Sequence, residues 1–170
     1  EMATLFDSSL GRSWRSNEQD ERSWAAITGL DITELWKVRN VLRAKLVEFA
    51  RREHSSACAR RHETAASGSH SNDILDSQIL TIGFARRFAA YKRASLLFRD
   101  FERFARLLQD SKHPVQFLFA GKAHPADLPA KDILAQVFGV SHSAEMATRF
   151  VFLEDYDMEI ARMLVQGVDI

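Results

Sequence analysis

The chain has 170 residues, enough for one domain with a buried core. Its 23 basic and 23 acidic side chains cancel, so no overall positive field favours nucleic acid or an anionic membrane surface. The lone cysteine, Cys58, excludes a disulfide within the chain and a cysteine-ligated metal cluster, and no apolar run reaches the roughly 20 residues of a membrane span. Any anion specificity must therefore come from a local group of cations, and we expect no bound metal.

Residues 1–54 are predicted to form a helical lead-in. Scattered aromatic residues among polar ones indicate short helices and turns over residues 1–30. Asp31 followed by Glu34 has the pattern of a helix start, and apolar residues at helical spacing then predict one amphipathic helix to about residue 54. Residues 55–76 are rich in Ser, Ala and His without a period, which predicts a loop.

Residues 77–170 have a different pattern, in which short apolar runs alternate with helical ones. We predict strands at about 79–84, 115–120 and 150–153, helices at about 90–109, 129–139 and 157–166, and a fourth strand barely begun at the C-terminus. Near-continuous apolar strands alternating with helices are typical of a parallel sheet covered on both faces. The predicted fold class is therefore α/β, with flanking helices on a parallel sheet.

A basic cluster follows the first predicted strand. Its members are Arg86, Arg87, Lys92 and Arg93. Placed around the start of the predicted helix, these cations would oppose the helix dipole by a few tenths of a kcal/mol or more, unless an anion reverses the balance. Arginine forks and a lysine charge suit phosphate oxygens. The alternative is a solvated basic face paired with Asp100 and Glu102.

Two further clusters should meet the first at one edge, because the carboxyl ends of parallel strands lie together. The second strand is followed by Gly121 and Lys122, without the spacing of a Walker loop, so a simple strand-to-helix turn is the alternative. The third strand runs into Glu154, Asp155, Tyr156 and Asp157. These carboxylates could serve a metal or a sugar, or an aspartate could cap the next helix.

At these clusters the chain resembles the α-glucan (glycogen or starch) phosphorylases, particularly their bacterial branch. The matching stretches are residues 80–87 (LTIGFARR), 91–94 (YKRA), 119–127 (FAGKAHPAD), 152–158 (FLEDYDM) and 167–169 (GVD). Their order and spacing match over roughly residues 78–170, and the lead-in matches less strongly. By this resemblance the chain is identified as a fragment from the start of the family's C-terminal, cofactor-binding domain.

The resemblance implies a two-domain glycosyltransferase-type enzyme, of which residues 77–170 would form half of a Rossmann-like sheet. Such an enzyme is cytoplasmic and uses inorganic phosphate to release glucose 1-phosphate from α-1,4-glucan ends. It carries pyridoxal phosphate, whose phosphate group takes part in proton transfer. By this likeness Arg87 and Lys92 would be catalytic and would grip the substrate phosphate, with Tyr91 facing the glucosyl unit. Arg86, Lys92 and Tyr156 would line the cofactor phosphate.

The sequence also departs from that family. The animal branch has His-Glu at Ala89-Ala90 and an arginine at Asp157. The family's cofactor lysine would lie beyond Ile170, so we expect the isolated chain to be inactive. It should also self-associate through exposed apolar surface.

Two other functions stay open on the sequence. One is a sugar-nucleotide glycosyltransferase, similar to glycogen synthase, in which an Arg…Lys pair faces a diphosphate. The other is a non-enzymatic module whose basic edge docks an acidic partner.

Overall fold

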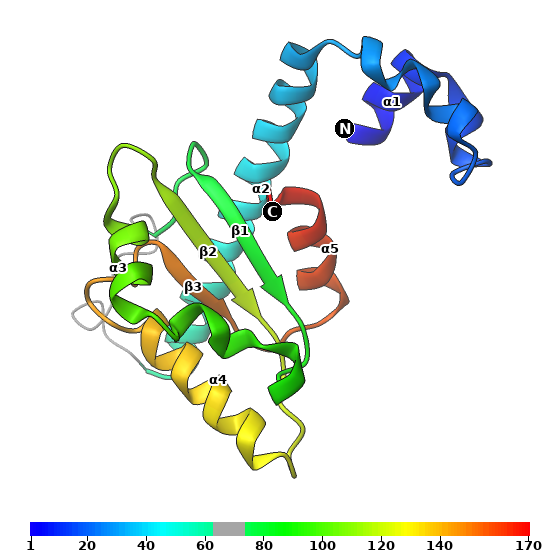
Figure 1. Ribbon diagram of the computed structural model, residues 1–170. Coiled ribbons are helices and arrows are strands. Elements are labelled where there is room, and N and C mark those ends of the chain that lie inside the picture. The colour runs from blue at the N-terminus through cyan, green and yellow to red at the C-terminus, as the bar shows by residue number, and fades with distance from the viewer. Residues whose placement is uncertain (63–73) are drawn as a thin grey trace. The chain divides into compact units, whose positions relative to one another are not determined.

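The computed structural model describes residues 1–62 and 74–170, which form two compact units, Glu1–Leu42 and Arg43–Ile170 (Figure 1). The first unit contains α1 (Met2–Leu10), two 3-10 helices, η1 (Arg12–Arg15) and η2 (Glu21–Gly29), and the start of α2 (Ile32–Arg60). Its centre is an aromatic cluster in which Phe6 meets Trp14 and Trp24 edge-on, at 5.6 Å between ring centroids. None of the helices in the described ranges has the length and apolar character of a membrane span.

Helix α2 begins where the sequence predicts and ends later. The Asp31 carboxylate accepts the backbone N–H of Thr33 at 2.8 Å, which confirms the predicted cap. The helix continues to Arg60, so the predicted end near residue 54 and a loop from residue 55 are wrong. Ala57 is buried against the rest of the second unit, and such packing outweighs a weak local signal. Residues 63–73 of the predicted loop lie outside the described residues.

A parallel sheet forms the centre of the second unit and confirms the predicted α/β class. Its strands are β1 (Leu80–Ala85), β2 (Val115–Ala120) and β3 (Phe150–Leu153), paired in the order β1-β2-β3. The last residues of the chain run beside β1, where Gly83 N–H donates to the Ile170 carbonyl at 2.8 Å. No strand is assigned to residues 168–170, so the predicted fourth strand stays a prediction, and the three parallel strands are consistent with half of a Rossmann-like sheet.

Both faces of the sheet are covered by helices, because successive residues of each strand point to opposite faces and are apolar on both. The helices of this unit beyond α2 are α3 (Phe101–Gln109), α4 (Leu128–Ser141) and α5 (Met158–Gly167). Phe117 and Phe150 pack with α3 and α4 on one face, while Leu118 and Val151 pack with α2 and α5 on the other. The layers are visible in Figure 1. The sheet edges and ends are thus left as the places where polar loops gather.

The predicted helix over residues 90–109 is wrong in its first half. Two short 3-10 helices, η3 (Ala90–Lys92) and η4 (Ala94–Phe98), are separated by Arg93 in a left-handed conformation with φ of 58°. The α-helix starts only after Asp100, whose carboxylate accepts the N–H of Arg103 at 3.0 Å. The basic cluster therefore does not surround an α-helix N-terminus, which is physically reasonable because cations there oppose the dipole.

Candidate anion site at the carboxyl edge of the sheet

The loops after β1 and β2 stay paired beyond the ends of both strands. Arg86 N–H donates to the Ala120 carbonyl at 3.2 Å, and Phe88 N–H donates to the Lys122 carbonyl at 2.9 Å. The Phe88 side chain is fully buried and anchors this segment. A Cβ at Gly121 would lie 2.1 Å from the Arg86 carbonyl oxygen, so only glycine permits this approach. The first basic residues are therefore held on a rigid edge.

Three of the sequence-predicted site residues come together on this edge. The pKa of Tyr91 is lowered, first by hydrogen bonding to Arg87 and then by the charge of Lys92. The Lys92 ammonium lies 4.7 Å from the centroid of the Tyr91 ring. Because Tyr91 itself is exposed, the two cations flank a solvent-accessible hydroxyl. An anion arriving there would meet a guanidinium, an ammonium and a phenol together.

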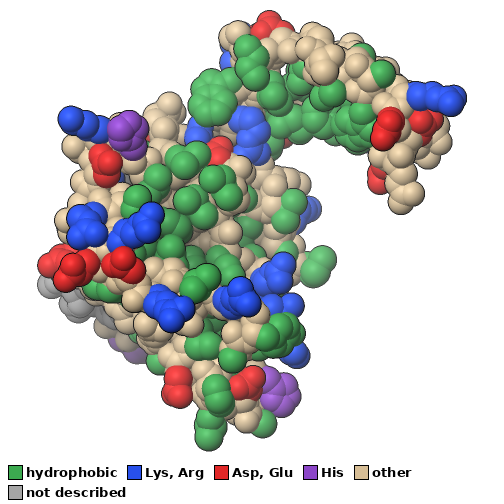
Figure 2. Space-filling model, in the orientation of Figure 1, with side chains coloured by type: hydrophobic (Ala, Val, Ile, Leu, Met, Phe, Trp, Pro, Cys, Tyr) green, Lys and Arg blue, Asp and Glu red, His purple; other side chains and the backbone are tan. Residues whose placement is uncertain are grey.

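In the part of the chain that the structure describes, the cations of this group have no carboxylate partner. Within residues 1–62 and 74–170, no ion pair involves Arg86, Arg87 or Lys92. The alternative partners are already used, since Asp100 caps α3 and Glu102 lies 3.9 Å from Arg106. Figure 2 shows Lys and Arg side chains gathered on the face where β1 ends. The alternative of a basic face neutralised by those two acids is therefore wrong.

The acidic cluster after β3 is engaged with two arginines near the end of α2. Glu154 is paired with Arg61, and Asp155 lies 3.3 Å from Arg60, the last residue of α2. Asp157 accepts the N–H of Ile160 at 2.9 Å and so caps α5, as one interpretation of the sequence proposed. Among the described residues no cluster of His, Cys, Asp or Glu could hold a metal ion.

Tyr156 lies at the same edge but in different surroundings. It is half-buried and packs against the apolar core between the sheet and α2 and α5. In the described part of the chain it makes no hydrogen bond with Arg86 or Lys92. The structure therefore brings Arg87, Tyr91 and Lys92 together, and places Arg86 and Tyr156 on the neighbouring loops.

The loop after β2 is a structural turn, as its alternative interpretation proposed. His124 accepts the N–H of Ala126 at 3.2 Å through Nδ1, and Asp127 accepts the N–H of Ala130 at 3.0 Å to cap α4. Both side chains are thus engaged in shaping the turn. The exposed Lys122 is the one residue of this loop that adds a cation to the edge.

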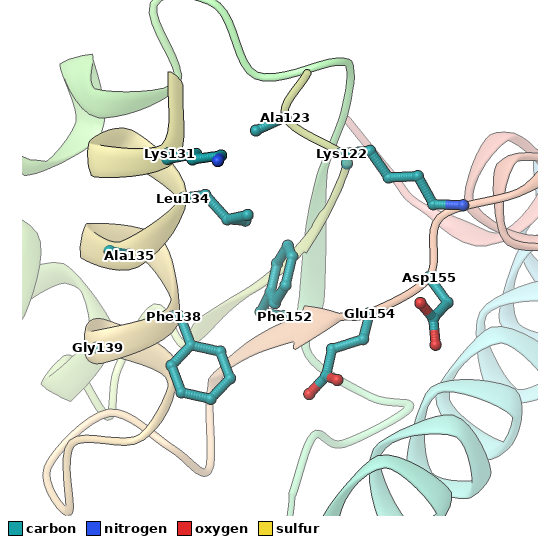
Figure 3. A pocket seen from close by; sticks show the side chains of 11 residues that line it. Lys122, Ala123, Lys131, Leu134, Ala135, Phe138, Gly139, Phe152, Glu154 and Asp155 are labelled. Carbon is teal, nitrogen blue, oxygen red and sulfur yellow. The ribbon is translucent and has the colours of Figure 1, made fainter. Parts of the chain in front are cut away.

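A pocket of about 660 Å³ lies between α4 and the loops that follow β2 and β3. Its floor is apolar, with Leu134, Phe138 and Phe152 turned toward one another in Figure 3, and Lys131 and Glu154 stand at its rim. The guanidinium of Arg61, which already holds Glu154, also lies 5.4 Å from the Phe138 ring centroid. The pocket wall is therefore fixed by a residue from the far end of α2.

Arg60 and Arg61 are the positioning residues that the sequence did not reveal. They are separated from their partners by 95 and 93 residues, so no local pattern links them. A possible signal was the pair of adjacent arginines at the end of a helix, where cations suit the dipole.

The amino-acid sequence of the chain is similar to those of known proteins. No protein-family model matches the chain. Over all 170 residues it is 34% identical to a glycogen phosphorylase from Aquifex aeolicus and 35% identical to a maltodextrin phosphorylase from Thermococcus litoralis, of which it spans 25% and 20%. Over 147 residues, 86% of the chain, it is 37% identical to a glycogen phosphorylase from Mycobacterium tuberculosis, of which it spans 17%. None of these names favours a sugar-nucleotide transferase. The chain belongs to the α-glucan phosphorylase family and corresponds to a quarter or less of the length of these relatives.

Proposed function

We propose that this chain supplies the phosphate-binding edge of an enzyme that cleaves α-1,4-glucan ends with inorganic phosphate and releases glucose 1-phosphate. The observation that carries the proposal is the convergence of Arg87 and Lys92 on Tyr91, with no carboxylate partner for either cation among the described residues. Buried or clustered cations are normally paired, and a group left unpaired at the carboxyl edge of a parallel sheet is suited to an anionic ligand. The names of the relatives supply the glucan and the phosphorolysis.

Each residue has a distinct part in this proposal. Arg87 offers a planar fork to two phosphate oxygens, and Lys92 adds a mobile charge beside the Tyr91 ring. Each such charge-assisted bond contributes about 1.5–3 kcal/mol before the costs of association. The Tyr91 hydroxyl, with its lowered pKa, would orient the glucosyl unit that leaves as a phosphate ester.

The same edge fits the phosphate group of pyridoxal phosphate, the cofactor that the family resemblance implies. Arg86 is exposed on the loop after β1 and has no ion-pair partner in the described ranges, so its charge is available for a second phosphate beside the first. We assign Arg86, Lys92 and Tyr156 to this group, with Tyr156 walling its apolar side. When bound, the cofactor supplies a phosphate that exchanges a proton with the substrate phosphate. The cytoplasmic location, the inactivity of the isolated chain and its self-association stay predictions.

A phosphate titration followed by ¹⁵N–¹H NMR tests the proposal on the chain itself. Inorganic phosphate should shift the amides of residues 87–92 before other amides, with weak affinity. Arg87→Gln should abolish this response. Arg106→Gln is the matched control, since it removes one exposed arginine that already has an acidic neighbour on α3 and should leave the titration unchanged.

A second titration in the same NMR experiment tests the assignment of the cofactor-binding residues. Pyridoxine 5′-phosphate, which lacks the reactive aldehyde, should shift the amides near Arg86 and Tyr156, whereas pyridoxine should not. Amides of residues 86–92 that stay unmoved by both phosphate and pyridoxine phosphate would overturn the proposal. Equal loss of binding in Arg87→Gln and Arg106→Gln would do so as well, because it would reduce the effect to net charge.

A further inference from the structure

The segment of residues 91–93 contributes side chains to two different surfaces, because the backbone turns between Lys92 and Arg93. Arg93 adopts φ of 58°, a left-handed conformation that is uncommon for a residue with a Cβ. The turn ends η3 and starts η4, so Lys92 stays with Tyr91 while Arg93 lines a separate pocket. Strain of this kind persists only where the surrounding structure imposes it, and it is common at ligand sites.

The second pocket has a volume of about 600 Å³ and lies between η4 and α4. Its polar lining consists of Arg93, Ser95, Arg99 and Gln136. Within the described residues neither arginine has an ion-pair partner. Asp132, one helical turn before Gln136 on α4, also forms no ion pair there. Two guanidinium groups, a hydroxyl and an amide thus face one concavity without an anion to neutralise them.

The pocket is built on a rigid support, which distinguishes it from a chance pair of surface arginines. Ala94 and Phe98, the first and last residues of η4, are buried at 2% and 5% exposure in the aromatic core. Phe98 packs edge-on against Phe104 and Phe150, at 5.4 and 5.6 Å between ring centroids. The backbone that carries Arg93, Ser95 and Arg99 is therefore fixed by the core, which lowers the entropy cost of binding.

We propose that this pocket is a second anion site, specific for a phosphate dianion, and separate from the edge formed by Arg87 and Lys92. Two arginine forks match phosphate oxygens, and Ser95 and Gln136 can donate further hydrogen bonds. The phosphate can come from inorganic phosphate or from a small phosphorylated molecule, and the volume accommodates a sugar phosphate. The site does not depend on the glucan phosphorolysis proposed above, since none of its arginines belongs to that edge.

The test uses the whole chain, ¹⁵N-labelled, with inorganic phosphate and glucose 6-phosphate as separate probes at constant ionic strength set with sodium chloride. Either probe should shift the amides of residues 93–99 and the side-chain amide of Gln136. Tighter binding of glucose 6-phosphate identifies a phosphorylated molecule as the ligand, and equal or tighter binding of phosphate identifies the inorganic ion.

Variants separate this pocket from the first site. Arg99→Gln should weaken binding about tenfold, the loss of one charge-assisted bond. Arg93→Gly should do the same without backbone damage, because glycine accepts a φ of 58°. Arg87→Gln should abolish the response at residues 87–92 and leave residues 95–99 responsive, so failure of one site is distinguishable from failure of the other.

Two results would overturn the proposal. One is the absence of shifts at residues 93–99 and Gln136 with both probes. The other is an affinity there that falls no further in Arg99→Gln than in the control Arg106→Gln, since that would show that only net charge matters.

Discussion

The two ends of the sheet differ in how far their charged and polar groups are paired with one another. At the amino end, Arg43 is buried at 2% exposure and lies 2.8 Å from Asp169, and the same carboxylate oxygen accepts the N–H of Thr81 at 2.9 Å. Gln116, beneath them, bonds both the hydroxyl of Thr81 and the backbone of Asp76. At this end a buried ion pair and the hydrogen bonds of Gln116 join the start of the sheet to α2 and to the last residues of the chain.

At the carboxyl end the cations have no acidic partners among the described residues. Arg86 and Arg87 lie in a loop whose backbone is hydrogen-bonded to the loop after β2, and Lys92 lies in the following η3, yet their charges meet no carboxylate in the described ranges. The acids nearest in sequence cap or pair elsewhere. The contrast shows that a rigid backbone does not require neutralised charges. The amino end is rigid, its charges are paired, and it stabilises the fold. The carboxyl end is rigid but its cations are not neutralised, so it is suited to an external anion.

The largest expected effect comes from breaking the buried ion pair. Arg43→Ala should lower the free energy of unfolding by about 3–5 kcal/mol, because it removes a buried cation that lies 2.8 Å from the largely buried Asp169 carboxylate. Urea denaturation followed by circular dichroism measures this. Arg52→Ala is the control on the same helix, since Arg52 pairs with Glu48 in solvent and should cost less than about 1 kcal/mol. Equal losses of unfolding free energy in the two variants would mean that the ion pair at the amino end contributes no more than a surface pair.

An intermediate effect on stability is expected at Gly121, where the loop after β2 passes close to the loop after β1. Gly121→Ala should destabilise the chain by about 1–3 kcal/mol, because its Cβ would collide with the Arg86 carbonyl at 2.1 Å. Gly139→Ala, in α4 with open space around the new Cβ, should instead stabilise by about 0.5–1 kcal/mol. Both are measured by urea denaturation. If Gly121→Ala leaves the free energy of unfolding unchanged, the loops at this edge can move to accept the new Cβ. That result would weaken the assignment of a preorganised anion site.

The smallest expected effect on stability comes from the carboxyl end. Arg87→Gln should leave the urea midpoint unchanged, since no ion pair is lost. It should instead raise the pKa of Tyr91 toward its ordinary value, because the hydrogen bond from Arg87 is the main cause of the lowering. A Tyr156→Phe background leaves Tyr91 as the sole tyrosine, so ultraviolet absorbance during a pH titration follows it alone.

The sign of the pH dependence follows from the same shift. A lowered pKa of Tyr91 in the folded chain adds stability above the ordinary tyrosine pKa, and this stability is lost as the pH falls through the folded value. Arg87→Gln should therefore reduce stability at alkaline pH and not at neutral pH. An ionisation midpoint that stays in place, or falls, would contradict the contact between Arg87 and Tyr91.

Much of the fold could be predicted from the sequence because its signals are local. The runs at residues 115–120 and 150–153 are apolar on both faces, and their strands match the prediction at both ends. The residues of the basic cluster could likewise be recognised, since Arg87 and Lys92 stand in a short segment directly after a strand.

Only the tertiary structure decided which charges are neutralised and which are left for a ligand. Arg61 reaches Glu154, and Arg43 reaches Asp169, across 93 and 126 residues, and no periodicity encodes such distances. The left-handed turn at Arg93 is another example, because the core contacts of Ala94 and Phe98 impose it against the local preference for a helix. Composition and pattern thus determine the strands and the positions of the cations, while packing determines their partners, because pairing depends on distances in space that the chain sets only after it has folded.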